Sequence, residues 1–126
     1  MPKQAIHTDN APAAIGVYSQ AIKAGDTVYI SGQIPLDPAS GKIVSDDINE
    51  QIHQVFRNMA AVAEASGGSL NDAVKVTIFL TDLGNFAAVN EIMAQYFPEP
   101  YPARAALEIS ALPLGSLVEA DAILSL

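Results

Sequence analysis

Apolar residues recur at three- and four-residue intervals in two segments of the chain, which predicts two helices. The first is predicted to begin after Asp47, with Glu50 three residues on as in a capping box, and to end at Gly67-Gly68. The second is predicted from about Asn85 to a stop at Pro98. Their apolar faces are Ile48, Ile52, Val55, Phe56, Met59 and Val62 in the first helix, and Phe86, Val89, Met93, Tyr96 and Phe97 in the second.

Alternation of apolar and polar positions predicts strands before, between and after these helices. The clearest strand is 74–80, where valine, isoleucine and leucine occupy every second position. Gly25-Asp26 is predicted to be the tight turn of a hairpin. The other predicted strands are 3–8, 20–24, 27–31, about 103–111 and about 116–124, with a short edge strand at Ile43-Val44.

The order of the predicted elements is strands, helix, strand, helix, strands. This order favours an α+β fold in which both helices cover one face of a sheet. The length of 126 residues, with no repeat and no linker, predicts a single domain over residues 1–126. The second face of the sheet then has no cover, which favours packing against other subunits.

Composition and charge exclude several classes of function. The chain is 50% hydrophobic and 16% charged, so it is globular, and its net charge of −8 disfavours nucleic-acid backbones and anionic membrane surfaces. It has no cysteine, which excludes thiolate catalysis and zinc–thiolate sites, and its two histidines disfavour a multi-histidine metal site. With no secretory-signal pattern and no apolar run near the ~20 residues that span a bilayer, the expected location is the cytoplasm.

Arg104 is the first candidate for chemistry, because the chain has only two arginines and the other, Arg57, lies within the first predicted helix. Arg104 is surrounded by alanines on a predicted strand, which leaves room for a ligand to reach it. Its guanidinium is a fixed fork suited to a carboxylate. The alternative interpretation is a structural salt bridge to a nearby acidic side chain.

Glu119 is the second candidate. It alternates with Val118 and Ala120 on the last predicted strand and shares a face with Asp121. A carboxylate in this position can hold and activate a water molecule. The alternative interpretation is a solvated face of the strand.

A simple hairpin around residues 112–115 would place Arg104 opposite residue 123 and Glu119 near Glu108. Four residues of strand separate the two candidates by about 13 Å, which is long for one small ligand to bridge. Either the register is shifted, or the two side chains meet across a subunit boundary.

Four further residues have both a plain and a functional interpretation. Tyr18 follows a flexible loop and either packs as a plug or orients a ligand, and Asn90 is an exposed helix position or a ligand contact. Ser31-Gly32 either marks only the end of a strand or provides a backbone N–H that binds an anion, since glycine permits close approach. No phosphate-binding loop or dinucleotide fingerprint is present, and a serine-hydrolase triad has little support.

Five ordered segments, which together extend over nearly the whole chain, form a recognisable pattern. They are NAPAAIGVYSQA at 10–21, ISGQIP at 30–35, VKVTIFLTDL at 74–83, FAAVN at 86–90, and YPAR at 101–104 continuing through Leu112-Pro113 to Val118-Glu119. In this order and spacing they resemble the RidA/YjgF family of enamine/imine deaminases. Two of the segments depart from the usual family pattern, with Val17 in place of a frequent proline and Ala106 in place of a frequent cysteine.

The resemblance implies a chorismate-mutase-like α+β fold and a homotrimer with ligand clefts between subunits. It implies hydrolysis of 2-aminoacrylate, its tautomer 2-iminopropanoate and 2-iminobutanoate to 2-keto acids and ammonia, without a cofactor or a metal. By resemblance, Arg104 binds the substrate carboxylate, Glu119 positions the attacking water, and the backbone carbonyl of Ala106 accepts a hydrogen bond from the substrate nitrogen. Further residues that the resemblance places along the cleft are Tyr18, Ser31, Gly32 and Asn90.

Three alternatives remain open from the sequence. An endoribonuclease or translation inhibitor is disfavoured by the charge of −8 and the lack of a basic stripe. A non-catalytic trimer that binds small ligands, as a sensor or a chaperone, would use the same arginine. Chorismate mutase activity follows only from fold analogy, and the chain has few cationic groups to clamp a dicarboxylate.

Overall fold

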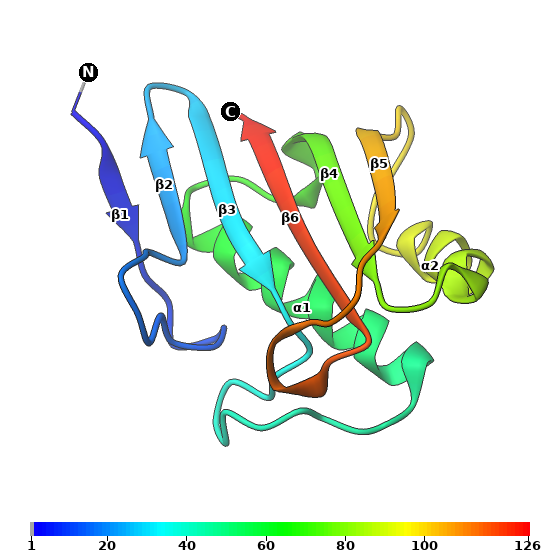
Figure 1. The fold of residues 1–126 in the computed structure, drawn as a ribbon. Helices are drawn as coiled ribbons and strands as arrows, with labels where there is room; N and C mark the ends of the chain where they lie inside the picture. The colour runs from blue at the N-terminus through cyan, green and yellow to red at the C-terminus, as the bar shows by residue number, and fades with distance from the viewer. Residues whose placement is uncertain (1) are drawn as a thin grey trace.

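A six-stranded sheet with the spatial order β1-β2-β3-β6-β4-β5 is the frame of the molecule (Figure 1). It is seen in a computed structural model that describes residues 2–126. The α+β architecture predicted from the sequence is confirmed. The strands are β1 Gln4–Ile6, β2 Ala21–Ala24, β3 Thr27–Gln33, β4 Ala73–Leu80, β5 Ala103–Glu108 and β6 Val118–Ser125.

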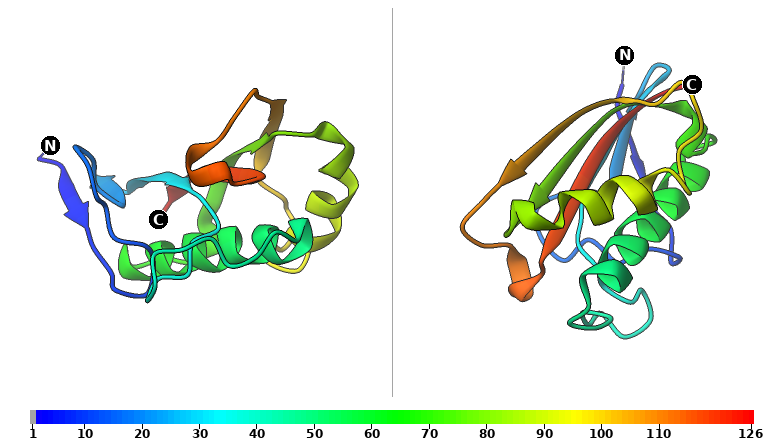
Figure 2. Two further views of the ribbon diagram at one scale, coloured as in Figure 1. Left: turned by 60° about the horizontal axis from the view of Figure 1, so that its bottom comes forward. Right: turned by 90° about the vertical axis from the view of Figure 1, so that its right-hand side faces the viewer.

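Both α-helices cover the same face of this sheet, as the views along its edges show (Figure 2). The longer helix, α1, packs on β3 and β6 and contacts the shorter α2. The hydrophobic core lies between α1 and the central strands, where Val28, Val76, Ile78 and Ala120 are fully or almost fully buried. The helices are α1 Ile48–Ala65 and α2 Phe86–Met93, with short 3-10 turns η1 Leu70–Asp72, η2 Leu83–Asn85 and η3 Pro113–Gly115.

The last strand lies in the middle of the sheet, between β3 and β4, and pairs antiparallel with both. Strand β5 pairs parallel with β4, because α2 carries the chain back to the end of the sheet at which β4 began. The predicted hairpin between 103–111 and 116–124 is therefore wrong. The strands on either side of the 112–115 turn are separated by β4, so the turn joins strands that are not neighbours.

The start of α1 is capped as predicted, with a different partner for the second half of the motif. The Asp47 carboxylate accepts a hydrogen bond from the Glu50 backbone N–H at 2.9 Å. The Asp47 N–H donates to the Ser45 hydroxyl at 3.0 Å. In a capping box, the side chain of Glu50 would accept this hydrogen bond. At the other end, Gly67 has the left-handed φ of +94° expected of a helix-terminating glycine.

Several predicted elements are shorter than expected, among them the second helix, the short edge strand and the strands predicted at 3–8 and 103–111. Helix α2 ends at Met93 rather than at Pro98, and the apolar residues beyond it are held by packing, since the Phe97 ring lies 5.4 Å from that of Phe56. The edge strand expected at Ile43 is a single isolated bridge to Leu36. The prolines in this segment remove the backbone donors that a longer ladder needs.

The other face of the sheet has no helix over it (Figure 2). Tyr29 and Leu107, whose side chains point to this face, are 51% and 47% exposed. The predicted uncovered face is therefore present, and its burial against other subunits stays a prediction. Within residues 2–126, neither helix has the length and apolar character needed to cross a membrane.

Candidate functional site

The guanidinium of Arg104 is held by helix α2 at the outer edge of the sheet. Arg104 Nη1 donates to Asn90 Oδ1 at 2.5 Å and lies 3.7 Å from the sulfur of Met93. The ring of Phe86 faces the guanidinium, with its centroid 4.7 Å from Cζ. Phe86, Asn90 and Met93 are four and three residues apart, so they lie on the same side of the helix. The helix thus fixes the direction of the charge while the side chain stays exposed.

No carboxylate neutralises this arginine. Over residues 2–126 the one ion pair is between His7 and Asp9, at 3.1 Å, so the structural salt bridge considered for Arg104 is not formed. A guanidinium has five N–H donors, and the amide oxygen of Asn90 engages one nitrogen. The free donors border a hollow of about 430 Å³, here called the arginine cleft, lined by Asn90, Met93, Ala94, Tyr101, Pro102 and Arg104.

Glu119 lies on β6 with its side chain on the uncovered face. It pairs in register with Phe79 of β4, and it is half-buried. Burial raises the pKa of the Glu119 carboxyl above its usual range, and the nearby charge of Asp121 raises it further. A carboxyl of this kind is better suited to exchanging protons near neutral pH than an ordinary surface glutamate.

Gly32 makes room for this carboxyl. The register of β3 against β6 shifts between Ile30 and Gln33, and Gly32 lies within this irregular stretch. A Cβ atom built on Gly32 would lie 2.9 Å from Cδ of Glu119 and closer still to one carboxylate oxygen. The Glu119 side chain lies directly over the backbone of β3 at Gly32, so any side chain at this position would force the carboxyl to move.

Replacing Gly32 with alanine is expected to lower turnover by about a hundredfold, because the added methyl displaces the carboxyl to which the family resemblance assigns the attacking water. The check is a double-mutant cycle in which kcat is measured for Gly32→Ala, Glu119→Gln and the combined variant. If the methyl acts through Glu119, adding it to Glu119→Gln costs little more activity. Fully additive losses would show that Gly32 acts independently of this carboxyl.

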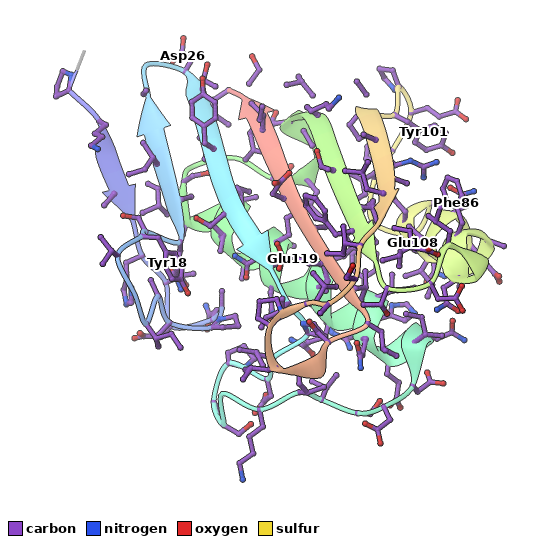
Figure 3. The ribbon with its side chains drawn as sticks, in the orientation of Figure 1. Tyr18, Asp26, Phe86, Tyr101, Glu108 and Glu119 are labelled. Carbon is purple, nitrogen blue, oxygen red and sulfur yellow. The ribbon has the colours of Figure 1, made fainter. Side chains whose placement is uncertain are left out.

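Tyr18, Ser31, Gly32 and Glu119 line one hollow of about 730 Å³, here called the glutamate cleft. The Ser31 hydroxyl donates to the Ser19 carbonyl at 2.5 Å, and the Ser31 N–H donates to the Gln20 carbonyl at 3.0 Å, so β3 is tied to the loop before β2. Tyr18 projects from that loop and is 54% exposed. Tyr18 comes from the loop before β2 and Glu119 from β6 (Figure 3), so separate segments of the chain supply the lining of this cleft.

The arginine cleft and the glutamate cleft do not join within one chain. Arg104 pairs with Val76, whose side chain lies on the face covered by the helices. Glu119 pairs with Phe79, whose side chain lies on the uncovered face. Because strand residues alternate between faces, the two side chains point to opposite sides of the sheet. The expectation that Arg104 lies opposite residue 123 is wrong, since β4 intervenes.

Glu108 and Glu119 are also kept apart by β4, so the close carboxylate pair expected from the hairpin does not form. Glu108 instead accepts a hydrogen bond from the Leu83 N–H at 2.9 Å. Its carboxylate therefore anchors the start of η2 rather than contacting Glu119.

The backbone carbonyl of Ala106 is directed to the free edge of β5. The N–H of Ile109 bonds to the Leu80 carbonyl of β4 at 2.9 Å, and backbone groups of successive strand residues point in alternate directions. The N–H and C=O of Arg104, Ala106 and Glu108 thus point away from β4. The carbonyl is available to an external donor at the same edge as the Arg104 guanidinium.

Asp121 offers a direct test of the charge around Glu119. The two carboxyls share one face of β6, and burial raises the pKa of Asp121 as well, against the opposing effect of hydrogen bonds with Thr77. Asp121→Asn removes the second cause of the raised Glu119 pKa and leaves burial, the larger one. The acid limb of the kcat–pH profile is expected to move to lower pH. An unchanged limb would show that another group controls it.

Three residues around the candidate site were not singled out from the sequence as functional. Phe86 and Met93 were assigned only to an apolar helix face, although their spacing from Asn90 is the signal that they share its side. Leu114 lines the glutamate cleft beside Pro113, and the sequence offered no cue to its position. No cluster of three or more potential metal-ligating side chains occurs in residues 2–126.

Comparison with known proteins gives consistent matches. The model of the family described as Endoribonuclease L-PSP matches residues 8–125. A RutC family protein of Pyrococcus horikoshii is 54% identical over 96% of both chains, and the human 2-iminobutanoate/2-iminopropanoate deaminase is 46% identical over 96% of this chain and 88% of its own. The crystal structure of RidA from a Psychrobacter species has a TM-score of 0.94 and 52% identity, over 98% of this chain and 99% of that one.

The matches extend over the strands that carry Arg104, Ser31 and Glu119, so they include both clefts. These proteins resemble the chain in sequence as well as in structure, so the matches show a common family and not only a common fold. With its sheet order, its two helices on one face and these matches, the chain belongs to the RidA/YjgF family.

Proposed function

We propose that this chain is a hydrolytic deaminase that converts 2-enamine and 2-imino acids, such as 2-aminoacrylate, 2-iminopropanoate and 2-iminobutanoate, to 2-keto acids and ammonia. The observation that carries the proposal is that residues 2–126 provide both an arginine without a carboxylate partner, Arg104, and a half-buried carboxyl whose pKa is raised, Glu119. The deaminase named among the relatives supports the same reaction class.

Arg104 is the group that binds the substrate carboxylate. Its fork can form two parallel hydrogen bonds to the two carboxylate oxygens, which sets the position and the plane of the adjacent C2 atom. The Ala106 carbonyl at the same edge accepts a hydrogen bond from the imine nitrogen. An imine hydrolyses in water unaided, so orientation supplies much of what catalysis requires.

Glu119 is the group that positions and deprotonates water. As the water oxygen forms a bond to C2, its proton passes to the carboxylate and the C=N electron pair moves to nitrogen. The carboxyl then returns this proton to the nitrogen, which gives a tetrahedral amino alcohol. The carboxylate next takes the hydroxyl proton and passes it to the same nitrogen as the C–N bond breaks, so ammonia leaves and the C=O bond of the 2-keto acid forms, with no redox change and no cofactor.

The site proposed here is completed by a second copy of the chain. The two clefts open on opposite sides of one sheet, so an arginine cleft must meet the glutamate cleft of another copy. Contact between two different surfaces of identical chains gives a closed ring when the rotation between neighbours closes, and the proposed homotrimer is such a ring of three copies, the number that the family resemblance implies. The uncovered sheet face, with Tyr29 and Leu107 half-exposed, supplies an apolar surface for this assembly.

The experiment couples a threonine dehydratase to this protein and follows the release of 2-ketobutanoate. The matched control for Arg104→Ala is Arg57→Ala, because Arg57 is the other arginine and lies exposed on α1, outside both clefts. We expect faster release with the wild type and with Arg57→Ala, and the uncatalysed rate with Arg104→Ala. No acceleration by folded wild-type protein would refute the proposed activity.

A further inference from the structure

Leu114 occupies a backbone position that suits glycine or asparagine. The Ser116 N–H bonds to the Pro113 carbonyl at 3.1 Å, which closes a four-residue turn with Leu114 and Gly115 at its centre. Leu114 has φ 58° and ψ 23°, and Gly115 has φ 70°. These left-handed values match a type I′ turn, in which Asn-Gly is favoured at the central pair. Within residues 2–126, Leu114 is the one non-glycine residue with a positive φ.

Core packing does not account for leucine at this position either. The side chain of Leu114 is 67% exposed, so it contributes little buried apolar surface to the fold. Leu114 is unfavourable in this turn and is not buried in the core. Replacing it with a residue that tolerates the left-handed backbone would therefore make the folded protein more stable. Strained backbone of this kind occurs preferentially at functional sites.

The turn places Leu114 at the glutamate cleft. The segment between β5 and β6 crosses the first residues of β6 and reaches the end of β3 (Figure 1), and Leu114 and Glu119 line the same hollow. The polar side chains of this hollow include Ser31, Tyr18 and Glu119. Its apolar wall is supplied by Leu114 with Ile34, Leu36, Pro38 and Pro113.

We propose that Leu114 is a specificity-determining residue, whose side chain contacts the apolar side chain of a bound 2-imino acid. The inference rests on the proposed deaminase function and adds the direction of selectivity. In the single chain the glutamate cleft, of about 730 Å³, has this apolar wall beside Glu119, so a larger substrate side chain has an apolar surface to contact. A four-carbon branched side chain bound beside C2 reaches an apolar wall, while the methyl group of 2-iminopropanoate does not.

The test compares two substrates and two variants in the same assay. An amino-acid oxidase converts alanine to 2-iminopropanoate and leucine to 2-imino-4-methylpentanoate, while oxygen is reduced to hydrogen peroxide, which catalase removes. Semicarbazide traps imine that has not been hydrolysed, so activity is read as lost semicarbazone. Leu114→Asn suits the turn and removes the apolar contact, and Leu114→Met keeps both the strain and the apolar side chain.

For Leu114→Asn we expect the ratio of kcat/KM for the leucine-derived over the alanine-derived imine to fall about tenfold, because a lost apolar contact is worth 10- to 200-fold in discrimination. Leu114→Met is expected to keep the wild-type ratio. The asparagine variant is also expected to unfold at a higher temperature than the wild type and to keep its assembly size, since asparagine tolerates the left-handed turn.

An unchanged ratio in Leu114→Asn, or an equal fall for both substrates, would overturn the proposal. Dissociation of the assembly or a lower unfolding temperature would do so too, because Leu114 would then be a structural contact. Failure of the deaminase function itself has a different signature, since the wild type would hydrolyse neither imine.

Discussion

Replacing Arg104 with alanine is expected to lower kcat/KM about a thousandfold, because the charge-assisted hydrogen bonds to the substrate carboxylate are lost and C2 is no longer held. Arg104→Lys is expected to recover only a small part of this loss, since an ammonium group keeps the charge but not the two parallel bonds. The measurement is the steady-state rate of 2-ketobutanoate release at several substrate concentrations.

The control for this prediction is the folded state of the variant. Arg104 is exposed and makes no ion pair in residues 2–126, so its removal is expected to leave the unfolding temperature nearly unchanged. A loss of activity together with a large loss of stability would mean that the arginine is structural, and wild-type activity in Arg104→Ala would remove it from the site.

The second large effect is expected for Glu119→Gln, with a loss of about 10²- to 10⁴-fold in kcat, the range that a general base contributes. The amide has nearly the same shape as the carboxyl and fills the same space over Gly32, but it takes no proton from water. The wild-type kcat should fall as pH drops through the raised pKa of Glu119, since the catalytic form is the carboxylate.

Ligand binding by a variant without turnover distinguishes the proposed enzyme from a sensor. Glu119→Gln is expected to bind 2-ketobutanoate about as tightly as the wild type, because the carboxylate anchor, Arg104, is intact. Isothermal titration of both proteins measures this directly. If Glu119→Gln turns over normally, the role assigned to the carboxyl is wrong. A binding trimer becomes the better description only if the wild type binds 2-ketobutanoate and hydrolyses no imine.

The parts of the fold that could be predicted from sequence are those with strong local signals. Helix α1 has a complete apolar stripe, an aspartate cap and a terminating glycine, and its bounds follow closely. Helix α2 was predicted too long because Tyr96 and Phe97 continue its apolar spacing. They lie beyond the helix end and reach the core, where Phe97 is 1% exposed.

The strand pairing could not be predicted from adjacent segments. A short turn between 103–111 and 116–124 favours a hairpin, yet β5 pairs with β4 through the crossover formed by α2. That error placed Arg104 and Glu119 on neighbouring strands. Their true placement on opposite faces depends on β6 entering the middle of the sheet, a long-range arrangement with no local signal.

The candidate residues were predictable to different degrees. Arg104 was singled out by its scarcity and its small neighbours, and Gly32 by its place at the end of a strand. The reason for Gly32, a carboxyl lying over it, needed the structure. Leu114 was not predictable, because Leu-Gly carries none of the turn preference that Asn-Gly does.

In the proposed assembly, each site combines Arg104 from one copy of the chain with Glu119 from another. This arrangement is tested by co-assembling equal amounts of Arg104→Ala and Glu119→Gln, each inactive alone, under two affinity tags, and assaying the assemblies that carry both tags. In a trimer that carries both variants, one of the three sites has both side chains intact, so about a third of the wild-type activity is predicted. If both residues served one site from the same copy, every site would be defective. Activity no higher than that of the single variants would therefore contradict the account.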